Sequence, residues 1–177
     1  MAEEEIRSVI FDLDNTLHDA EFLTERAIKG TVEAMIGKGM KCDIEDGMNK
    51  FRDIIYNDPS GDKIRKLASF FDAYDEEIID AGWNFYKNPE FDRLIIYPDA
   101  KEVLDKLKSN HKMILVTQGF KDSQNKRIDT LGIREYFDEI YLTETGKKKE
   151  VFENILNNSG LKANEILVVG DRIDSEI

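Results

Sequence analysis

The sequence has little cysteine, little proline and no long apolar run. Its 177 residues include one cysteine, Cys42, and three prolines. A single cysteine excludes an intramolecular disulfide and a cysteine-based zinc site, and it fits a reducing compartment. No apolar run reaches the roughly eighteen residues that span a bilayer, and Met1 to Glu5 lack the basic and apolar regions of a secretory signal. We therefore expect a cytoplasmic globular protein.

Positive charges are outnumbered by negative ones. Lys and Arg number 25 against 37 Asp and Glu, so the formal net charge is −12. Such a chain repels phosphate backbones and anionic lipids, and we expect neither nucleic acid nor a membrane as its partner. An anionic small substrate then needs local positive charge or a metal ion. Nothing in these patterns fixes the oligomeric state.

Short apolar runs that stop at acidic, hydroxyl or glycine residues predict the strands. Continuous apolar runs of this length suit strands that are buried on both faces. We expect four strands, at residues 6–11, 112–117, 139–142 and 166–169. A weaker run at residues 94–97 precedes Pro98 and predicts a fifth.

Helical patterns alternate with these strands. One opens at Pro98, and two more cover residues 122–131 and 150–158. Gly132 and Gly160 follow the latter two, where a left-handed helix cap belongs. Strands that alternate with helices predict an α/β fold with a doubly wound parallel sheet.

Residues 19–88 show four helical patterns and no convincing strand. We expect an all-helical insertion after the first strand, so that residues 1–17 and 95–177 form the core domain and residues 18–94 the insertion. Side chains of the insertion that face the site would set specificity. Its aromatic residues are expected to form its own core instead. These are Phe70, Phe71, Trp83 and Tyr86.

Two carboxylates follow the first predicted strand, in the segment Asp12-Leu13-Asp14-Asn15-Thr16. Residues two apart in a strand point to the same face, so Asp12 and Asp14 can reach one ligand at the carboxyl end of the sheet. Close carboxylates suit Mg²⁺, which prefers oxygen ligands. Their environments can also divide their roles. A metal-bound Asp12 stays nucleophilic, while Asp14 carries a proton to or from a leaving group.

Two further segments carry groups suited to an anion. Thr117-Gln118-Gly119 ends the second strand, and its hydroxyl and backbone N–H groups form a small anion cradle beside the first site. Three lysines at residues 147–149 precede a predicted helix. Positive charge at a helix N-terminus is unfavourable on dipole grounds, so this run indicates either a bound anion or an exposed basic turn. A lysine there would balance the charge of a phosphate.

A third carboxylate follows the last predicted strand, in Gly170-Asp171-Arg172. Asp171 is thus expected at the same edge of the sheet as the first pair. Glu176, five residues on, is a further acid that can orient ligands or metal-bound water. Asp174 is the alternative for that supporting role.

These four segments, in this order, resemble the haloacid dehalogenase (HAD) superfamily of phosphohydrolases. The family pattern is D-x-D-x-T, a strand-end Ser or Thr, a Lys, and G-D followed by another acid. The long interval between the first two segments is where members with an all-helical cap carry it. The resemblance covers essentially the whole chain, and it implies a Rossmann-like core with an inserted α-helical cap.

The resemblance implies a phosphatase mechanism. Asp12 would attack phosphorus to form an aspartyl-phosphate, and Asp14 would act as general acid and base. Thr117 would hold phosphoryl oxygens, with Gln118 and Gly119 in the same substrate-binding turn. Lys148 would balance charge.

The resemblance also implies Mg²⁺ as cofactor. Its ligands would be Asp12, the backbone carbonyl of Asp14, and Asp171, with Glu176 as the supporting acid. The implied substrate is a small phosphorylated metabolite, whose identity the sequence does not give.

Some features depart from the family pattern. Gln118 stands where many relatives have Asn, and the proline that often follows the family's lysine is absent, so Lys147 and Lys149 stay as alternatives to Lys148. The chain stops at Ile177, whereas the family fold continues into a helix and at least one further strand. We expect a truncated chain, less stable and less active than an extended one.

Other functions also fit the pattern. One alternative is a sugar phosphomutase of the same superfamily. Another is a non-catalytic receiver-like or binding domain, which also uses strand-end acids with a Thr and a Lys but lacks the helical insertion. A third is an inactive fragment. Asp14 argues against a dehalogenase, because that reaction has no ester oxygen to protonate.

Overall fold

The computed structural model describes residues 5–58, 60–89, 91, 94–143 and 147–172. The chain divides into two compact units. Met1–Ala20 and Phe91–Ile177 form one, here called the sheet unit, and Glu21–Glu90 form the other, the helical unit. The helical unit is therefore an insertion in the sequence of the sheet unit.

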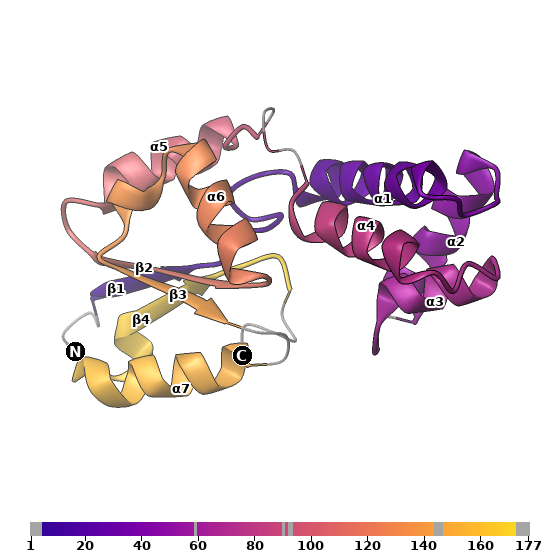
Figure 1. Ribbon diagram of the computed structural model, residues 1–177. Coiled ribbons are helices and arrows are strands. Elements are labelled where there is room, and N and C mark those ends of the chain that lie inside the picture. Colours follow the sequence, from indigo (N-terminus) through magenta and orange to yellow (C-terminus); the bar gives the residue numbers. More distant parts are fainter. Residues whose placement is uncertain (1–4, 59, 90, 92–93, 144–146, 173–177) are drawn as a thin grey trace. The chain divides into compact units, whose positions relative to one another are not determined.

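The sheet contains four parallel strands in the order β3-β2-β1-β4 (Figure 1). They are β1 (Ser8–Phe11), β2 (Lys112–Gln118), β3 (Glu139–Thr143) and β4 (Ile166–Val169). β1 pairs with both β2 and β4, so the N-terminal strand is central. The four main predicted strands and the parallel α/β fold are confirmed.

Helices connect the strands of the sheet unit. They are α5 (Pro98–Leu107), α6 (Lys121–Leu131) and α7 (Lys148–Ser159), with short 3₁₀ turns η1 (Arg134–Tyr136) and η2 (Ala163–Glu165). Pro98 begins α5, where its missing N–H costs nothing. Gly132 and Gly160 end α6 and α7 in the left-handed conformation, at φ 66° and 67°, as the sequence predicts.

Side chains of the strands alternate between two apolar clusters. On one face, Val9 and Phe11 pack in a cluster that includes Leu104 of α5 and Ile128 of α6. On the other face, Ile10 packs with Ile155 of α7. Figure 1 shows α5 and α6 on one side of the sheet and α7 on the other. The sheet is therefore covered on both faces, which explains its continuous apolar strands.

The weaker strand predicted at residues 94–97 is wrong. Within this run, Ile96 forms one isolated antiparallel bridge with His18, and α5 starts at Pro98. Ile95 is 75% exposed. Its apolar, β-branched residues suggested a strand buried on both faces, but the run is not buried in this way.

The helical unit contains the four helices that the sequence predicts. They are α1 (Ala20–Gly37), α2 (Ile44–Asn57), α3 (Lys63–Phe70) and α4 (Glu76–Lys87). The last three begin after an aspartate whose carboxylate accepts a hydrogen bond from a first-turn N–H. These caps are Asp43, Asp62 and Asp75.

The helical unit has its own core, which includes the fully buried Ile28, Phe51 and Leu67. Of the aromatic residues predicted to join it, Phe71, Trp83 and Tyr86 pack against this core. The prediction is wrong for Phe70, which is 60% exposed. Ile64, Leu67 and Ala68 form the buried face of α3, and Phe70 lies outside it with the Lys50 ammonium 4.7 Å from its ring centre.

Two glycines permit close helix contacts in this unit. A Cβ at Gly30 of α1 would lie 2.0 Å from ring atoms of Phe85. A Cβ at Gly82 of α4 would lie 2.8 Å from side-chain atoms of Ile64 and Met35. No larger residue fits at either position unless its neighbours shift.

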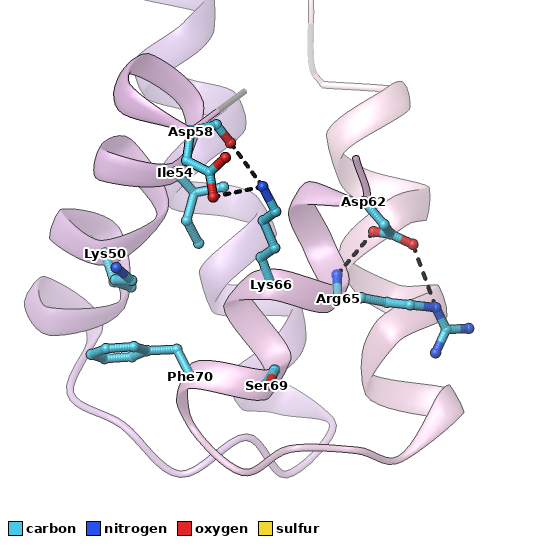
Figure 2. A pocket seen from close by; sticks show the side chains of 8 residues that line it. All are labelled: Lys50, Ile54, Asp58, Asp62, Arg65, Lys66, Ser69 and Phe70. Atoms are coloured by element: carbon cyan, nitrogen blue, oxygen red, sulfur yellow. Dashed lines mark hydrogen bonds and ion pairs between the residues drawn. The ribbon is translucent and has the colours of Figure 1, made fainter. Parts of the chain in front are cut away.

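An open hollow of about 580 Å³ lies between α2 and α3 (Figure 2). Its cationic groups have partners: Lys66 pairs with Asp58 at 2.6 Å, and Arg65 pairs with Asp62 and Glu76. The hollow therefore presents little uncompensated charge to an anion. Across the described ranges, no helix combines the length and apolar character that a membrane crossing requires.

Candidate active site

Asp12 lies at the carboxyl edge of the sheet, directly after β1. Its backbone N–H donates to the Val169 carbonyl of β4 at 2.9 Å, so it extends the β1–β4 pairing by one residue. Its Oδ2 lies 2.8 Å from the Lys148 Nζ, and the two side chains are each 8% exposed. Its Oδ1 accepts from the Leu13 N–H at 2.7 Å. Such a buried ion pair stays favourable only with close geometry and additional hydrogen bonds.

The three candidate lysines differ in burial. Lys148 is the first residue of α7 and is buried, whereas Lys147 and Lys149 are exposed. The positive end of the α7 dipole disfavours an ammonium group there, and the Asp12 carboxylate offsets that cost. The geometry therefore favours Lys148 as the partner of Asp12.

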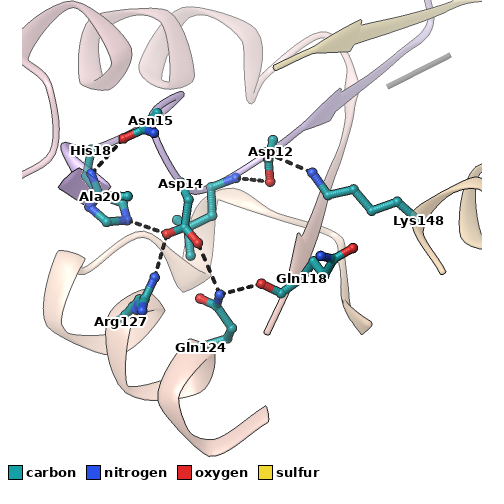
Figure 3. A network of polar contacts seen from close by, with 10 residues as sticks. Asp12, Asp14, Asn15, His18, Ala20, Gln118, Gln124, Arg127 and Lys148 are labelled. Carbon is teal, nitrogen blue, oxygen red and sulfur yellow. Dashed lines mark hydrogen bonds and ion pairs between the residues drawn. The ribbon is translucent and has the colours of Figure 1, made fainter. Parts of the chain in front are cut away.

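Asp14 occupies a different network, in the turn after β1 (Figure 3). Its Oδ1 accepts from Arg127 Nη1 at 2.7 Å and lies 3.0 Å from His18 Nε2. Its Oδ2 accepts from Gln124 Nε2 at 3.2 Å. Strand pairing does not extend beyond Asp12, and the Asp12 and Asp14 carboxylates have different partners.

The surroundings of Asp14 favour its ionised form. Burial acts to raise the pKa of this carboxyl, but the His18 hydrogen bond, the positive charge of Arg127 and the Gln124 hydrogen bond outweigh it. Together they lower the pKa of Asp14 to about 2. Asp14 in this arrangement is a carboxylate that can accept a proton, and it must take one up before it can act as an acid.

The turn after β2 brings a hydroxyl to the same edge. Thr117 is fully buried, and its Oγ1 has no hydrogen-bond partner among the described residues. Gly119 follows at φ 155°, and a Cβ there would lie 2.7 Å from Gln124 Nε2. Gln118 contributes its carbonyl, which accepts from that same amide at 2.9 Å. A buried hydroxyl without a partner is costly, and a bound anion would satisfy it.

Asp171 follows β4, which pairs with β1 through Phe11 and Val169. This register places Asp171 near the level of Asp12, at the same end of the sheet, and its side chain is exposed. The proposed supporting acids, Glu176 and Asp174, lie outside the described residues.

The oxygen donors at this edge fit a hard divalent cation. Asp12 and Asp171 supply carboxylates from adjacent strand ends, and Asp14 supplies a backbone carbonyl nearby in sequence. The described residues contain no cluster of three or more His, Cys, Asp or Glu side chains arranged for a metal. Mg²⁺ does not require one, because it is usually bound by one or two carboxylates, with water and substrate phosphate completing its shell.

Sequence reasoning missed three residues that contact Asp14: His18, Gln124 and Arg127. The last two are three positions apart on α6, so they lie on one helix face. One feature of the sequence could have pointed to them: Ser123 and Gln124 are polar, yet they stand in the first turns of a helix that packs against the sheet. Both of these side chains are buried.

Comparisons with known proteins agree with this architecture. The chain is 34% identical to a glyceraldehyde 3-phosphate phosphatase of Methanocaldococcus jannaschii, over 97% of this chain and 79% of that protein. It is 30% identical to a protein of the same name from Pyrococcus abyssi, over 97% and 76%. A crystal structure of a haloacid dehalogenase-like hydrolase from Xanthomonas campestris superposes with a TM-score of 0.67 at 18% identity, covering 100% of this chain and 78% of that one.

The family model for haloacid dehalogenase-like hydrolases matches residues 6–177, which include all four candidate segments. The match is to hydrolases, and the helical insertion that receiver domains lack is present in the fold. The chain therefore belongs to the haloacid dehalogenase-like hydrolase family.

Proposed function

We propose that the protein is a Mg²⁺-dependent phosphatase that hydrolyses a small phosphate monoester through a phosphorylated Asp12. The buried Asp12–Lys148 pair carries this proposal. A carboxylate held beside an ammonium group, at the ligand-binding edge of a parallel sheet, is a nucleophile with a countercharge for an incoming phosphate.

The adjacent groups support binding of a phosphoryl group. The Thr117 hydroxyl can donate to one phosphoryl oxygen, which would satisfy its unpartnered Oγ1. Lys148 can neutralise part of the negative charge that accumulates on the phosphoryl oxygens. Gly119 keeps the backbone of this turn open, since a side chain there would meet Gln124.

Asp14 is the proposed general acid and base. Asp14 first takes up a proton from solvent. As Asp12 then bonds to phosphorus and the ester bond breaks, that proton passes from Asp14 to the leaving oxygen. In the second step Asp14 takes a proton from the water that attacks the phosphoaspartate, which restores Asp12. Mg²⁺, held by Asp12, the Asp14 carbonyl and Asp171, would supply charge neutralisation at the phosphate.

We infer a three-carbon phosphorylated aldehyde as substrate class. The support is that relatives with 30% and 34% identity are glyceraldehyde 3-phosphate phosphatases. The net charge of −12 supports a small metabolite over nucleic acid or a membrane surface, and the single cysteine supports action in the cytoplasm. We further propose that the helical unit is a cap that selects the substrate.

A substrate panel tests this function. Release of inorganic phosphate is measured from glyceraldehyde 3-phosphate, other sugar and polyol phosphates, and para-nitrophenyl phosphate. Activity should vanish with EDTA and return with Mg²⁺, and Asp12→Asn should abolish it. Unchanged hydrolysis in EDTA, or near-normal turnover by Asp12→Asn, would contradict the mechanism. A sugar phosphomutase would instead interconvert two sugar phosphates with little release of inorganic phosphate.

A further inference from the structure

The Asp14 carboxylate is enclosed by donors from two parts of the sheet unit. His18 comes from the loop that follows β1, and Gln124 and Arg127 come from α6 (Figure 3). We call these three residues the Asp14 clamp. Gln124 and Arg127 lie 110 and 113 positions from Asp14 in the sequence, so tertiary folding alone brings them together.

The clamp holds Asp14 but leaves some of its own buried polar atoms without partners. Each member leaves one buried polar atom without a partner among the described residues: His18 Nδ1, Gln124 Oε1 and Arg127 Nε. His18 is fully buried, and Gln124 is 2% exposed. Native structures satisfy nearly all such atoms, so these three atoms cost stability, and the shared contacts with the Asp14 carboxylate offset that cost.

One clamp residue also connects Asp14 to the turn that follows Thr117. The Gln124 amide donates both to Asp14 Oδ2 and to the Gln118 carbonyl, at 3.2 and 2.9 Å. Gly119 gives that amide room, because a Cβ there would overlap it. The orientation of the Asp14 carboxylate is thereby tied to the turn proposed to hold the phosphate.

We infer that Arg127 and Gln124, together with His18, are positioning residues that aim the Asp14 carboxyl group at the ester oxygen of the substrate. This inference rests on the proposed function of Asp14 as general acid and base. The clamp residues act through Asp14 and are not assigned contact with substrate. Proton transfer depends steeply on the distance and direction between donor and acceptor, so a misdirected Asp14 slows it.

The choice of leaving group separates this role from a general structural one. An alkoxide leaves phosphorus only with a proton from Asp14, whereas nitrophenolate leaves as a stable anion. The value of kcat/KM reports the steps up to and including departure of the alcohol. The clamp is inferred to assist that departure, because it orients the proton donor. Loss of the clamp should therefore affect an alkyl ester far more than an aryl ester.

The test compares kcat/KM for glyceraldehyde 3-phosphate and para-nitrophenyl phosphate in wild type, Arg127→Met and Gln124→Met. We expect kcat/KM to fall roughly 10- to 100-fold for the alkyl ester, which is part of the usual contribution of acid–base catalysis, and at most about threefold for the aryl ester. Arg127→Lys, which keeps a cationic donor, should recover part of the loss. Lys126→Met removes an exposed positive charge from the same helix and should change neither value.

Each other outcome overturns the inference. Equal losses of kcat/KM on both esters would show that the clamp only supports the fold. Lower melting temperatures of the variants would then report the loss of stability directly. An unchanged or raised kcat/KM for the alkyl ester in Arg127→Met would show that the clamp does not aim Asp14. A wild-type protein that hydrolyses neither ester would overturn both the proposed function and the inference. Wild-type hydrolysis of the aryl ester alone would leave the phosphatase function and remove only the acid role of Asp14.

Discussion

The Lys148 ammonium lies 2.8 Å from the Asp12 carboxylate, and both groups are almost completely withdrawn from solvent. Each residue stands at the end of a different element: Asp12 after a strand, and Lys148 at the start of a helix. Their contact therefore requires that β1 and α7 are both in place, and it links the assembly of the fold to the assembly of the site.

The three neighbouring lysines should differ sharply in their contribution to activity. Lys148→Ala should lower kcat by about 100-fold or more, because it removes a preorganised positive charge from the phosphoryl group. Lys147→Ala and Lys149→Ala should stay near the wild-type rate, because exposed lysines contribute little. Steady-state kinetics on para-nitrophenyl phosphate decides this. Three mild and equal effects would show that all three lysines belong to the solvated surface.

Replacement of Thr117 by Val should separate activity from stability. Valine has the same shape without the unpartnered hydroxyl, so the free energy of unfolding should stay unchanged or rise by up to about 1 kcal/mol. Phosphatase kcat/KM should fall, since the proposed contact with phosphate is lost. Thr117→Ser keeps the hydroxyl and serves as the control. A marked drop in melting temperature for Thr117→Val would mean that the hydroxyl stabilises the protein by itself.

Asp14→Asn should abolish proton transfer while Mg²⁺ still binds. The proposed metal contact of residue 14 is its backbone carbonyl, which the substitution keeps. The new amide places an NH₂ group among donors from His18, Gln124 and Arg127, so the melting temperature should also fall. Mg²⁺ affinity can be measured by calorimetry. A large loss of Mg²⁺ affinity in this variant would show that the Asp14 side chain binds the metal.

Substitution by alanine should change the stability of the protein in opposite directions at two glycines of α1. Gly30→Ala should destabilise the protein by about 1–3 kcal/mol, because the new methyl group overlaps the Phe85 ring. At Gly37 a Cβ meets no atom within 4 Å, and alanine should stabilise by about 0.5–1 kcal/mol through helix propensity. Urea denaturation of the two variants measures both. Equal shifts would show that the α1–α4 contact at Gly30 is looser than described.

The sequence predicts well what depends on local pattern. The strand that ends at Asp12 and the helices that end at Gly132 and Gly160 follow from short apolar runs and from turn residues, and the structure agrees. The run at residues 94–97 failed because its β-branched residues do not reveal that Ile95 faces solvent. Composition alone cannot give the exposure of a side chain.

The partners of the site residues were harder to predict. Lys148 was favoured by its resemblance to the family's lysine, but Lys147 and Lys149 stayed as alternatives, because only the first turn of α7 decides which of the three side chains points toward the sheet. The Asp14 clamp was missed because Gln124 and Arg127 are remote in sequence and ordinary in composition for a helix. Polar residues on a buried helix face are the signal that would have found them.

The central position of β1 has a consequence for the order in which the chain can fold during synthesis. Ser8 and its partner Lys112 are 104 residues apart, so β1 leaves the ribosome long before any strand exists to pair with it. At about 5–20 residues per second, the wait is roughly 5 to 20 seconds. The four helices of the insertion have mostly local contacts and can form within that interval. Throughout it, the Val9-Ile10-Phe11 segment is an unpaired apolar strand that can pair with another copy of the chain.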